Sequence, residues 1–464
     1  MEEEYSALLK ENTWSLVPPS PSQNVVGSKW VFRLKRHIDG SILRYKARMV
    51  AKGFHQHPGV DFFEMFNPVI KASTIRVVLS IAVTNGWLLR QLDFNNAFLN
   101  GHLEENVYMM QPPGYVHLSY PNYACKLNKA IYGLKQAPRE WNATLSKEHL
   151  KWGFINSRSN FSLFIFRRNN YVVLLLVYVD DIIVTGNDSV LISTLIKSLD
   201  KQFALKDLGR LTYFLGFQVN YLESGFILNQ GKYISDLLHK LQLSDLKPAP
   251  SPSVVGKNLF AFGGTPLEDP FVYRNTIGAL QYLTNTRPDI AYIINQLSQF
   301  LQKPTDLHWQ AVKCVLKYLS GTKSFGLMFQ QGDDLAISAY SDADWASNIN
   351  DRKSIVAYCI FIGNTLVFWS SKKQTVVARS STKSEYRALA LVASEVIWLK
   401  QLLLELTSYP SRKPVIWCDN ISSGALAMNP VFHARTKHIE IDVHFVRDQV
   451  LKGALEVRYV SSVD

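Results

Sequence analysis

The stretch YVVLLLVYVDDIIVTG, residues 171–186, determines most of what the sequence predicts about the fold. Two runs of aliphatic and β-branched residues flank the pair Asp180-Asp181, which predicts two buried strands joined by a tight turn. Ionised carboxylates that are buried without a counter-charge are costly, and adjacent ones repel each other. The pattern therefore indicates either a turn whose acids are hydrated, because Asp favours turns, or a site where a divalent cation neutralises the pair.

A third carboxylate favours the metal. Asp93 follows the apolar run WLLRQL (87–92), and we expect it at a strand end before a turn. Three carboxylates can hold two Mg²⁺ ions, which activate an attacking hydroxyl and stabilise the leaving pyrophosphate in an in-line phosphoryl transfer. The sequence contains no cluster of Cys and His that would select a softer metal.

Composition and charge limit the class of protein. The chain has 464 residues, 47% of them hydrophobic, which suits several globular domains. Its net charge of +12 favours a polyanionic partner, above all nucleic acid. Four cysteines without a CxxC pair argue against a disulfide scaffold or a zinc ribbon. The N-terminus lacks the pattern of a signal peptide and the longest apolar run is too short for a bilayer, so we expect a soluble, intracellular protein without a membrane partner.

The chain divides by composition. Residues 248–270 are rich in Pro and Gly and are typical of a linker between 1–247 and a segment 271–334. The latter has apolar residues at the three- and four-residue spacing of helices, and we expect it to serve packing only. A further domain is expected over 335–464.

An N-terminal hairpin carries a cationic face. Residues 29–35 and 44–52 alternate in polarity around Asp39-Gly40, which predicts a β-hairpin. By parity the cations fall on one face: Lys29, Arg33 and Lys35 in the first strand, and Arg44, Lys46, Arg48 and Lys52 in the second. Such a face can bind a phosphate backbone or a triphosphate, whereas most charge runs are simply solvated. The one-sided sorting favours binding.

The C-terminal segment has acids of its own. Asp342 follows the alternating run AISAYS, and Asp419 follows VIWC. Between them, residues 384–406 are predicted to form a long helix with Glu385 on the edge of its apolar stripe. Glu385 then needs a partner, which is either a cation or helix dipole or a metal in a second phosphodiester site.

Five strings carry a resemblance: QLDFNNAFLNG, CKLNKAIYGLKQAPREW, YVDDIIVTG, YSDADWAS and SSKKQTVVARSST. In this order they resemble the reverse transcriptase–ribonuclease H region of copia-type LTR retrotransposon polyproteins. The resemblance implies a multidomain α/β (α+β) fold, namely a right-hand polymerase with fingers, palm and thumb followed by an RNase H-like α/β domain. It assigns 1–247 to fingers and palm, 271–334 to a thumb or connection, and 335–464 to a C-terminally truncated RNase H-like domain.

The same resemblance implies roles for individual residues. The palm metal ligands would be Asp93, Asp180 and Asp181, and the first three RNase H carboxylates would be Asp342, Glu385 and Asp419. Phe98 matches the gate against a ribose 2′-hydroxyl, Gln136 the nucleotide-contacting glutamine, and Arg48 or Lys52 the cation for the triphosphate. The implied cofactor is Mg²⁺, two ions per active site, with Mn²⁺ as an alternative. The implied partners are an RNA template, a DNA primer, an RNA–DNA hybrid and dNTPs, in a pathway that ends in DNA integration.

Departures from the family pattern keep an alternative open. The sequence ends at Asp464, before the stretch that would supply a fourth RNase H carboxylate, and neither Glu440 nor Asp442 matches that position. Asn160 and Lys383 stand where relatives usually have Asp and Glu. We therefore expect an RNA-directed DNA polymerase with weak or absent hybrid cleavage. The alternative is a catalytically silent remnant that only binds nucleic acid, while a purely structural protein would leave the acids unexplained.

Overall fold

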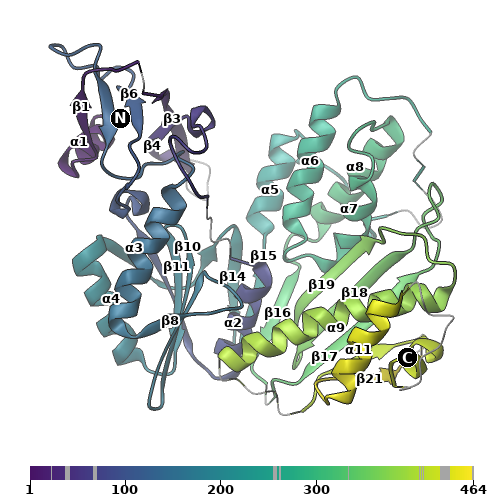
Figure 1. Cartoon of the computed structure of the whole chain (residues 1–464). Helices are drawn as coiled ribbons and strands as arrows, with labels where there is room; N and C mark the ends of the chain where they lie inside the picture. Colours follow the sequence, from purple (N-terminus) through teal and green to yellow (C-terminus); the bar gives the residue numbers. More distant parts are fainter. Residues whose placement is uncertain are drawn as a thin grey trace. The chain divides into compact units, whose positions relative to one another are not determined.

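The computed structural model describes residues 1–21, 23–36, 42–65, 70–253, 259–260, 263–332, 334–406, 408, 410, 412–428 and 439–461 (Figure 1). The predicted turn Asp39-Gly40 lies outside these residues. The chain forms two compact units, one of residues 1–71 and 88–210, the other of 72–87 and 211–464. The predicted mixed α/β class with several sheets is confirmed. The division at 247, 270 and 334 stays a prediction.

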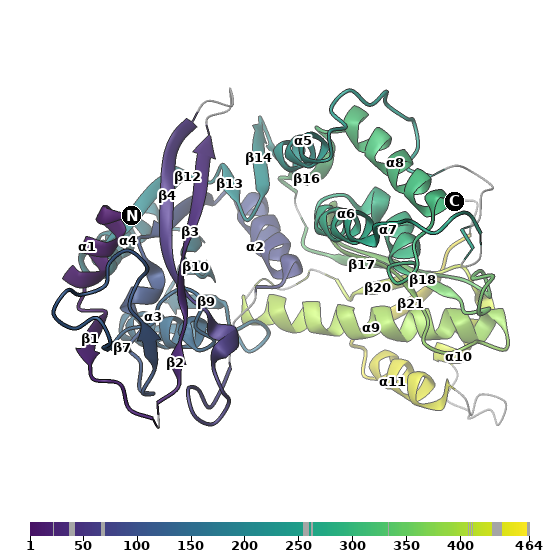
Figure 2. The same cartoon turned by 90° about the horizontal axis from the view of Figure 1, so that it is seen from above.

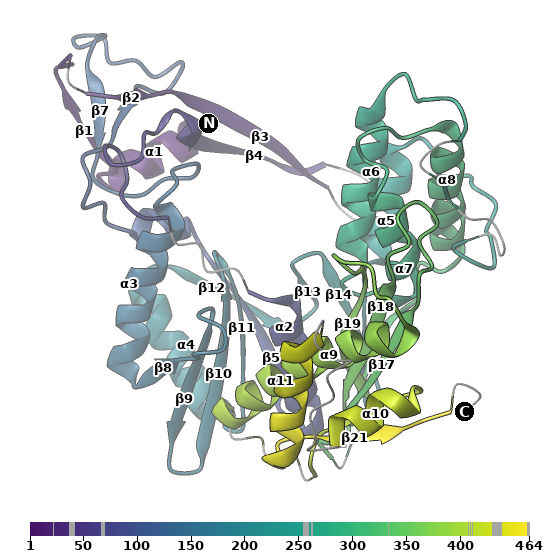
Figure 3. The ribbon, with the colours of Figure 1, turned by 45° about the vertical axis from the view of Figure 1, so that its right-hand side comes forward.

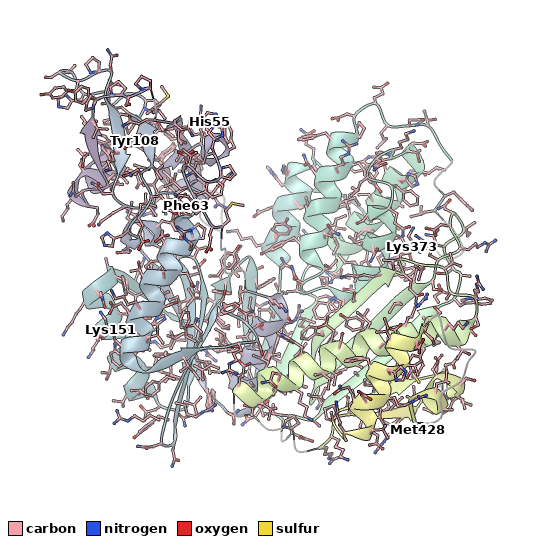
Figure 4. The ribbon with its side chains drawn as sticks, viewed as in Figure 1. His55, Phe63, Tyr108, Lys151, Lys373 and Met428 are labelled. Atoms are coloured by element: carbon pink, nitrogen blue, oxygen red, sulfur yellow. The ribbon has the colours of Figure 1, made fainter. Side chains whose placement is uncertain are left out.

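The first sheet of the N-terminal unit is small. Its order is β1-β7-β6-β2, with bounds β1 (Trp14–Val17), β7 (Ala124–Leu127), β6 (Tyr108–Met110) and β2 (Val25–Val26). Helix α1 (Glu2–Lys10) precedes it and buries Leu8. The short helix η1 (Gly53–His55) also belongs to this unit. Figure 4 labels its last residue, His55, and Phe63, which follows it in the chain.

The predicted hairpin forms a separate two-stranded ribbon of β3 (Ser28–Arg36) and β4 (Ile42–Ala51), which is drawn as a long arm in Figure 3. Its register pairs Arg33 with Lys46 and Val31 with Arg48. Paired residues of antiparallel strands lie on the same face. The predicted sorting onto one face is therefore confirmed by the register for Arg33, Lys46 and Arg48.

The second sheet is the centre of the N-terminal unit. Its six strands run in the order β12 (Leu205–Arg210), β5 (Leu88–Phe94), β11 (Asp181–Gly186), β10 (Tyr171–Tyr178), β9 (Leu163–Arg168) and β8 (Phe154–Asn156), with every neighbouring pair antiparallel. Helices α3 (Ala137–Trp152) and α4 (Ser189–Phe203) share one hydrophobic core with alternate residues of this sheet. Asp188 caps α4 by accepting a hydrogen bond from the N–H of Leu191 at 2.6 Å.

The C-terminal unit begins with an excursion of the chain, α2 (Ala72–Thr84), which packs on strands β16 and β19. Arg76 anchors this helix: it donates to the carbonyl oxygens of Val367 and Asn285 at 2.7 Å each, and its guanidinium lies 4.0 Å from the ring centroid of Trp369. Burial lowers the pKa of Arg76 to about 9. These contacts explain why a short segment belongs to a unit remote in sequence.

The middle of the C-terminal unit combines a sheet and a helical core. The sheet order is β13 (Tyr213–Phe214), β14 (Phe217–Leu222), β15 (Gly225–Asn229) and β16 (Gly326–Gln330). The helices are α5 (Gly231–Lys240), α6 (Pro270–Leu283), η3 (Pro288–Ile290), α7 (Ala291–Ser298) and α8 (Asp306–Gly321). Their apolar residues form one core, and the helical character predicted for 271–334 is confirmed over α6 to α8. It is wrong for residues 326–330, which form the strand β16 because they pair with β15.

The last part of the unit is a mixed five-stranded sheet. Its order is β19 (Thr365–Lys373), β18 (Ile355–Ile362), β17 (Ile337–Asp344), β20 (Val415–Cys418) and β21 (Glu456–Tyr459). The first three strands are antiparallel, whereas β17–β20 and β20–β21 are parallel. Figure 2 shows the long helix α9 (Ser381–Glu405) with α11 (Glu440–Leu451) beside it, and Figure 4 labels Met428 at the end of α10 (Ile421–Met428).

Candidate active sites

The turn between β10 and β11 holds the first site. Asp181 opens β11 and is the register partner of Asp93 on β5, while the carbonyl oxygen of Asp180 accepts a hydrogen bond from the N–H of Phe94 at 2.8 Å. Directly paired residues in an antiparallel sheet have Cβ atoms about 4.5–5.5 Å apart. The structure therefore brings together the three aspartates that the sequence predicts at one site.

The backbone of this turn is strained and held by a distant side chain. Val179 has a φ of 56°, a left-handed conformation that β-branched residues rarely adopt. The indole N–H of Trp141 donates to the Val179 carbonyl at 2.6 Å. A strained residue at a functional site persists where its surroundings over-determine it, and Trp141 supplies that constraint.

The carboxylates of the strands point away from the helices. Leu92, Phe94, Ile182 and Val184 belong to the core that α3 and α4 cover. Side chains alternate along a strand. Asp93 and Asp181 accordingly lie on the opposite face of the sheet.

Two cations lie at this site. The Nη2 atom of Arg48 is 3.6 Å from Oδ2 of Asp180. Lys206 of β12 is the register partner of Asp93 on the other side of β5, and its side chain is exposed. The sequence prediction included Arg48 but missed Lys206, because the pairing of β12 with β5 is not visible in the chain order.

The other predicted residues of the N-terminal unit differ in their surroundings. Phe98 lies in η2 (Ala97–Asn100), buried, with its ring edge-on to Tyr132 at 4.7 Å between centroids. Gln136 is fully buried; its Nε2 donates to the carbonyl of Asp61 at 2.9 Å and its Oε1 accepts from Nε2 of Gln56 at 3.0 Å. Lys52 directly follows β4 and is half-buried. The amide of Gln136 is thus engaged inside the protein in this structure.

The second site lies at one edge of the five-stranded sheet. Ser341 of β17 is the register partner of Cys418 of the parallel strand β20, so the next residues, Asp342 and Asp419, lie side by side. Glu385 of α9 completes the group, and one ligand atom from each of the three lies within 4.8 Å of the others. Within the part of the chain that the structure describes, this group alone meets that spacing, and the aspartates of the first site do not.

Glu385 is the most perturbed member of this group. Its side chain is buried, Oε1 accepts a hydrogen bond from the N–H of Ala343 at 3.1 Å, and Oε2 has no hydrogen-bond partner among the described residues. Burial first, and then the charges of Asp342 and Asp419, raise its pKa to about 8. Of the partners proposed from the sequence, namely a cation, the helix dipole or a metal, the ion pair with a cation is not formed by any residue that the structure describes.

Asp342 is perturbed in the same direction. Burial, followed by the charges of Asp419 and Asp344, raises its pKa. Asp344 is a fourth acid that the sequence analysis did not single out, although it stands two residues along the same strand. Asp442, by contrast, has Arg387 as its charged neighbour. Hard oxygen ligands with one orphaned buried carboxylate oxygen fit a divalent cation such as Mg²⁺.

Comparison with known proteins agrees with the resemblance. Residues 11–255 match the family model described as reverse transcriptase (RNA-dependent DNA polymerase). The chain belongs to this family. It is 49% identical over its whole length to the retrovirus-related Pol polyprotein from transposon RE1 of Arabidopsis thaliana, and 38% identical over its whole length to that from transposon TNT 1-94 of Nicotiana tabacum. The predicted kinship with copia-type Pol polyproteins is confirmed.

The chain spans about a third of the length of these relatives, 32% of the RE1 polyprotein and 35% of the TNT 1-94 polyprotein. Among solved structures, LC11-RNase H1 isolated from compost matches 28% of this chain and 86% of its own, with 15% identity and a TM-score of 0.22. A likeness of this size does not establish a common fold. Among the described residues, no helix is both long and apolar enough to cross a bilayer.

Proposed function

We propose that this chain is an RNA-directed DNA polymerase that extends a DNA primer on an RNA template with dNTPs. The observation that carries the proposal is the register of Asp181 with Asp93, beside the turn that holds Asp180. A pair of Mg²⁺ ions at these acids would activate the primer 3′-hydroxyl and stabilise the departing pyrophosphate. The donor set suits this ion, because all three side chains offer hard oxygen ligands.

The chain's own residues then divide the work around the acids. Asp93, Asp180 and Asp181 would bind the metals. Arg48, which now lies against Asp180, would exchange this carboxylate for the triphosphate of the incoming nucleotide. Phe98 would exclude a ribose 2′-hydroxyl by its bulk, and Gln136 would position the pocket through its hydrogen bonds to Gln56 and Asp61.

We assign the second site to a ribonuclease H activity on RNA–DNA hybrids. Asp342, Glu385 and Asp419 would hold a pair of Mg²⁺ or Mn²⁺ ions there. The Oε2 atom of Glu385, which has no hydrogen-bond partner in the described part of the chain, supports this assignment. In the same proposal, 1–247 corresponds to fingers and palm, 271–334 to a thumb or connection, and 335–464 to an RNase H-like domain. Activity at both sites would serve synthesis of DNA destined for integration.

Primer extension tests the first activity. The full chain is incubated with an RNA template, a DNA primer, dNTPs and Mg²⁺, beside the variant Asp180→Asn/Asp181→Asn. We expect incorporation by the wild type and a loss of at least about a thousandfold in the variant, since each aspartate charge is needed to bind the metals. Asp188→Asn is the matched control, because Asn also caps a helix. Equal incorporation by the wild type and the double variant would reject the proposal. Absence of extension by both, with salt-dependent nucleic-acid binding retained, would favour the silent remnant.

Hybrid cleavage tests the second activity. A labelled RNA–DNA hybrid is incubated with Mg²⁺ or Mn²⁺ and the wild type, Glu385→Gln or Glu395→Gln, the last lying on the same helix. Cleavage lost only in Glu385→Gln would support the assignment. Cleavage that survives Glu385→Gln would place the activity elsewhere.

A further inference from the structure

Tyr132 reaches the first site because two backbones approach each other unusually closely. The N–H of Ala51 at the end of β4 donates to the carbonyl of Tyr132 at 2.8 Å. A Cβ atom on Gly133, whose φ is +94°, would lie 2.1 Å from the Ala51 carbonyl oxygen, and one on Gly53 would lie 2.0 Å from the Gly133 carbonyl oxygen. Only glycine fits both places, and this contact fixes where the neighbouring tyrosine projects.

The side chain of Tyr132 touches three residues of the proposed nucleotide site. Its ring meets the ring of Phe98 edge-on, with centroids 4.7 Å apart and an interplanar angle of 73°. The guanidinium of Arg48 lies 4.5 Å from the centroid of the Tyr132 ring. The hydroxyl oxygen lies 3.5 Å from Oδ2 of Asp180. One half-buried ring thus links the proposed sugar gate, the proposed triphosphate cation and a proposed metal ligand.

We infer that Tyr132 is a specificity-determining positioning residue, which fixes Phe98 against the sugar and Arg48 toward the triphosphate. This inference rests on the proposed polymerase function. An edge-to-face contact restricts the orientation of both rings, and a cation over an aromatic face is held without losing its hydrogen-bond donors. A gate discriminates between sugars only if its side chain cannot retreat, because an error of about 1 Å in a supporting residue is enough to loosen a site.

The contacts predict different results for different replacements. Tyr132→Phe keeps the ring that holds Phe98 and Arg48 and removes only the hydroxyl. Tyr132→Met fills a comparable volume with a flexible chain but removes the edge-to-face and cation–π contacts. Tyr5→Met is the matched control, because Tyr5 is also a partly buried tyrosine packed on the same core.

The experiment measures the preference for a dNTP over the matching rNTP twice: once during primer extension, and once as binding to a complex that cannot react. The ratio of kcat/KM for a dNTP to that for the matching rNTP is measured by primer extension with Mg²⁺. The same ratio is measured as binding, from the stability of complexes with a dideoxy-terminated primer that cannot react. We expect Tyr132→Met to lower both ratios by about tenfold or more and to raise KM for the dNTP, whereas Tyr132→Phe and Tyr5→Met change the ratios less than twofold.

The outcomes separate this inference from the proposed function. A wild type that neither extends primers nor prefers a dNTP in the unreactive complex would overturn both. A wild type that is active, with selectivity unchanged in a Tyr132→Met protein that melts cooperatively, would overturn the role of Tyr132 alone. Should the Met variant fail to fold, Tyr132→Trp gives the test: its larger ring displaces Phe98, so an unchanged ratio again rejects the inference.

Discussion

Asp180 lies 3.6 Å from the guanidinium of Arg48, whereas Glu385 has a buried carboxylate oxygen with no hydrogen-bond partner among the described residues. The two sites are thus neutralised differently. In the first, cations of the protein, Arg48 and Lys206, accompany the aspartates. In the second, the described groups that act on the pKa of Glu385 are two carboxylates and one backbone N–H.

The difference has a physical consequence for each site. At the first site Arg48 lies against Asp180, so a metal has to compete with this arginine for the carboxylate, and a triphosphate has to compete with the carboxylate for the arginine. At the second site, burial and the neighbouring carboxylates disfavour the charged form of Glu385, and a bound cation would restore it. In our proposal the first site therefore receives metal ions together with an anionic substrate that Arg48 can bind, whereas the second site receives metal ions at its acids alone.

The largest test of this comparison crosses the two sites. Asp181→Asn should reduce primer extension by about a thousandfold or more and leave hybrid cleavage within about twofold, and Glu385→Gln should do the reverse, because each change removes one ligand charge from one site only. Both activities are measured on the same preparations. A variant that loses both activities while keeping a wild-type melting curve would contradict two independent sites.

A smaller effect concerns stability without metal. In EDTA near neutral pH, Glu385→Gln should raise the free energy of unfolding by roughly 1–3 kcal/mol, because burial raises the pKa of this carboxyl and makes the folded chain take up a proton that the unfolded chain does not hold. The neutral amide avoids this cost, and its Oε1 can still accept from the N–H of Ala343. In millimolar Mg²⁺ this advantage should vanish, since only the wild type gains stability from the bound ion. Urea titrations in both buffers measure it.

Asp181→Asn provides the comparison for that measurement and should change stability in EDTA much less, because its site already contains cations. A Glu385→Gln protein that is less stable than the wild type in EDTA would show that the carboxylate is compensated by groups other than a metal.

Much of the fold could be predicted from local pattern. The alternation in 29–35 and 44–52 gave the correct faces of the ribbon, since parity needs no tertiary information. The long helix predicted over 384–406 is α9, with its stripe of Leu389, Val392 and Val396 fully buried. Helix α2 could not be assigned, because residues 73–82 are buried all round and show no single apolar face.

The acids of both candidate sites could be predicted from the sequence, but the residues that contact or position those acids could not. The aspartates follow apolar runs that predict strands, and Glu385 lies on the edge of the apolar stripe of a predicted helix. Both patterns are visible in the sequence. Lys206, Tyr132 and Trp141 were missed because their importance arises from strand register or from a close approach between distant segments. The roles assigned to Arg48, Phe98 and Gln136 stay predictions.

The N-terminal unit also contains a buried ionisable residue, His149, which can be compared with Glu385. His149 of α3 packs edge-on against Phe164 at 4.5 Å, and neither ring nitrogen has a hydrogen-bond partner among the described residues. Burial lowers its pKa to about 3. Unlike Glu385, it does not belong to a group of acids or other metal ligands among the residues that the structure describes.

His149 should therefore make the protein sensitive to acid. The unfolded chain protonates the imidazole below about pH 6.5, whereas the folded chain does not, so the free energy of unfolding falls as pH drops from about 6.5 towards 3. At pH 5 this amounts to about 2 kcal/mol. His149→Phe should remove that part of the decline, as measured by urea unfolding at pH 7.5 and pH 5. An equal decline in both proteins would mean that the imidazole finds a partner.

The smallest expected effect concerns the cationic face of the ribbon formed by β3 and β4, which belongs to the same unit as the acids of the first site. Arg33 and Lys46 are paired on one face of β3 and β4. If this face lies along phosphates, Arg33→Gln/Lys46→Gln should lower the slope of log K against log salt by about two and weaken binding to unrelated sequences equally. Filter binding of an RNA–DNA hybrid between low and high salt measures the slope. The paired variant Lys151→Gln/Lys147→Gln, on helix α3, controls for the loss of two charges. A slope that falls equally in both double variants would mean that the ribbon contributes to binding only through the net charge of the protein. The cations that act at the first site would then be Arg48 and Lys206 alone among those identified at it.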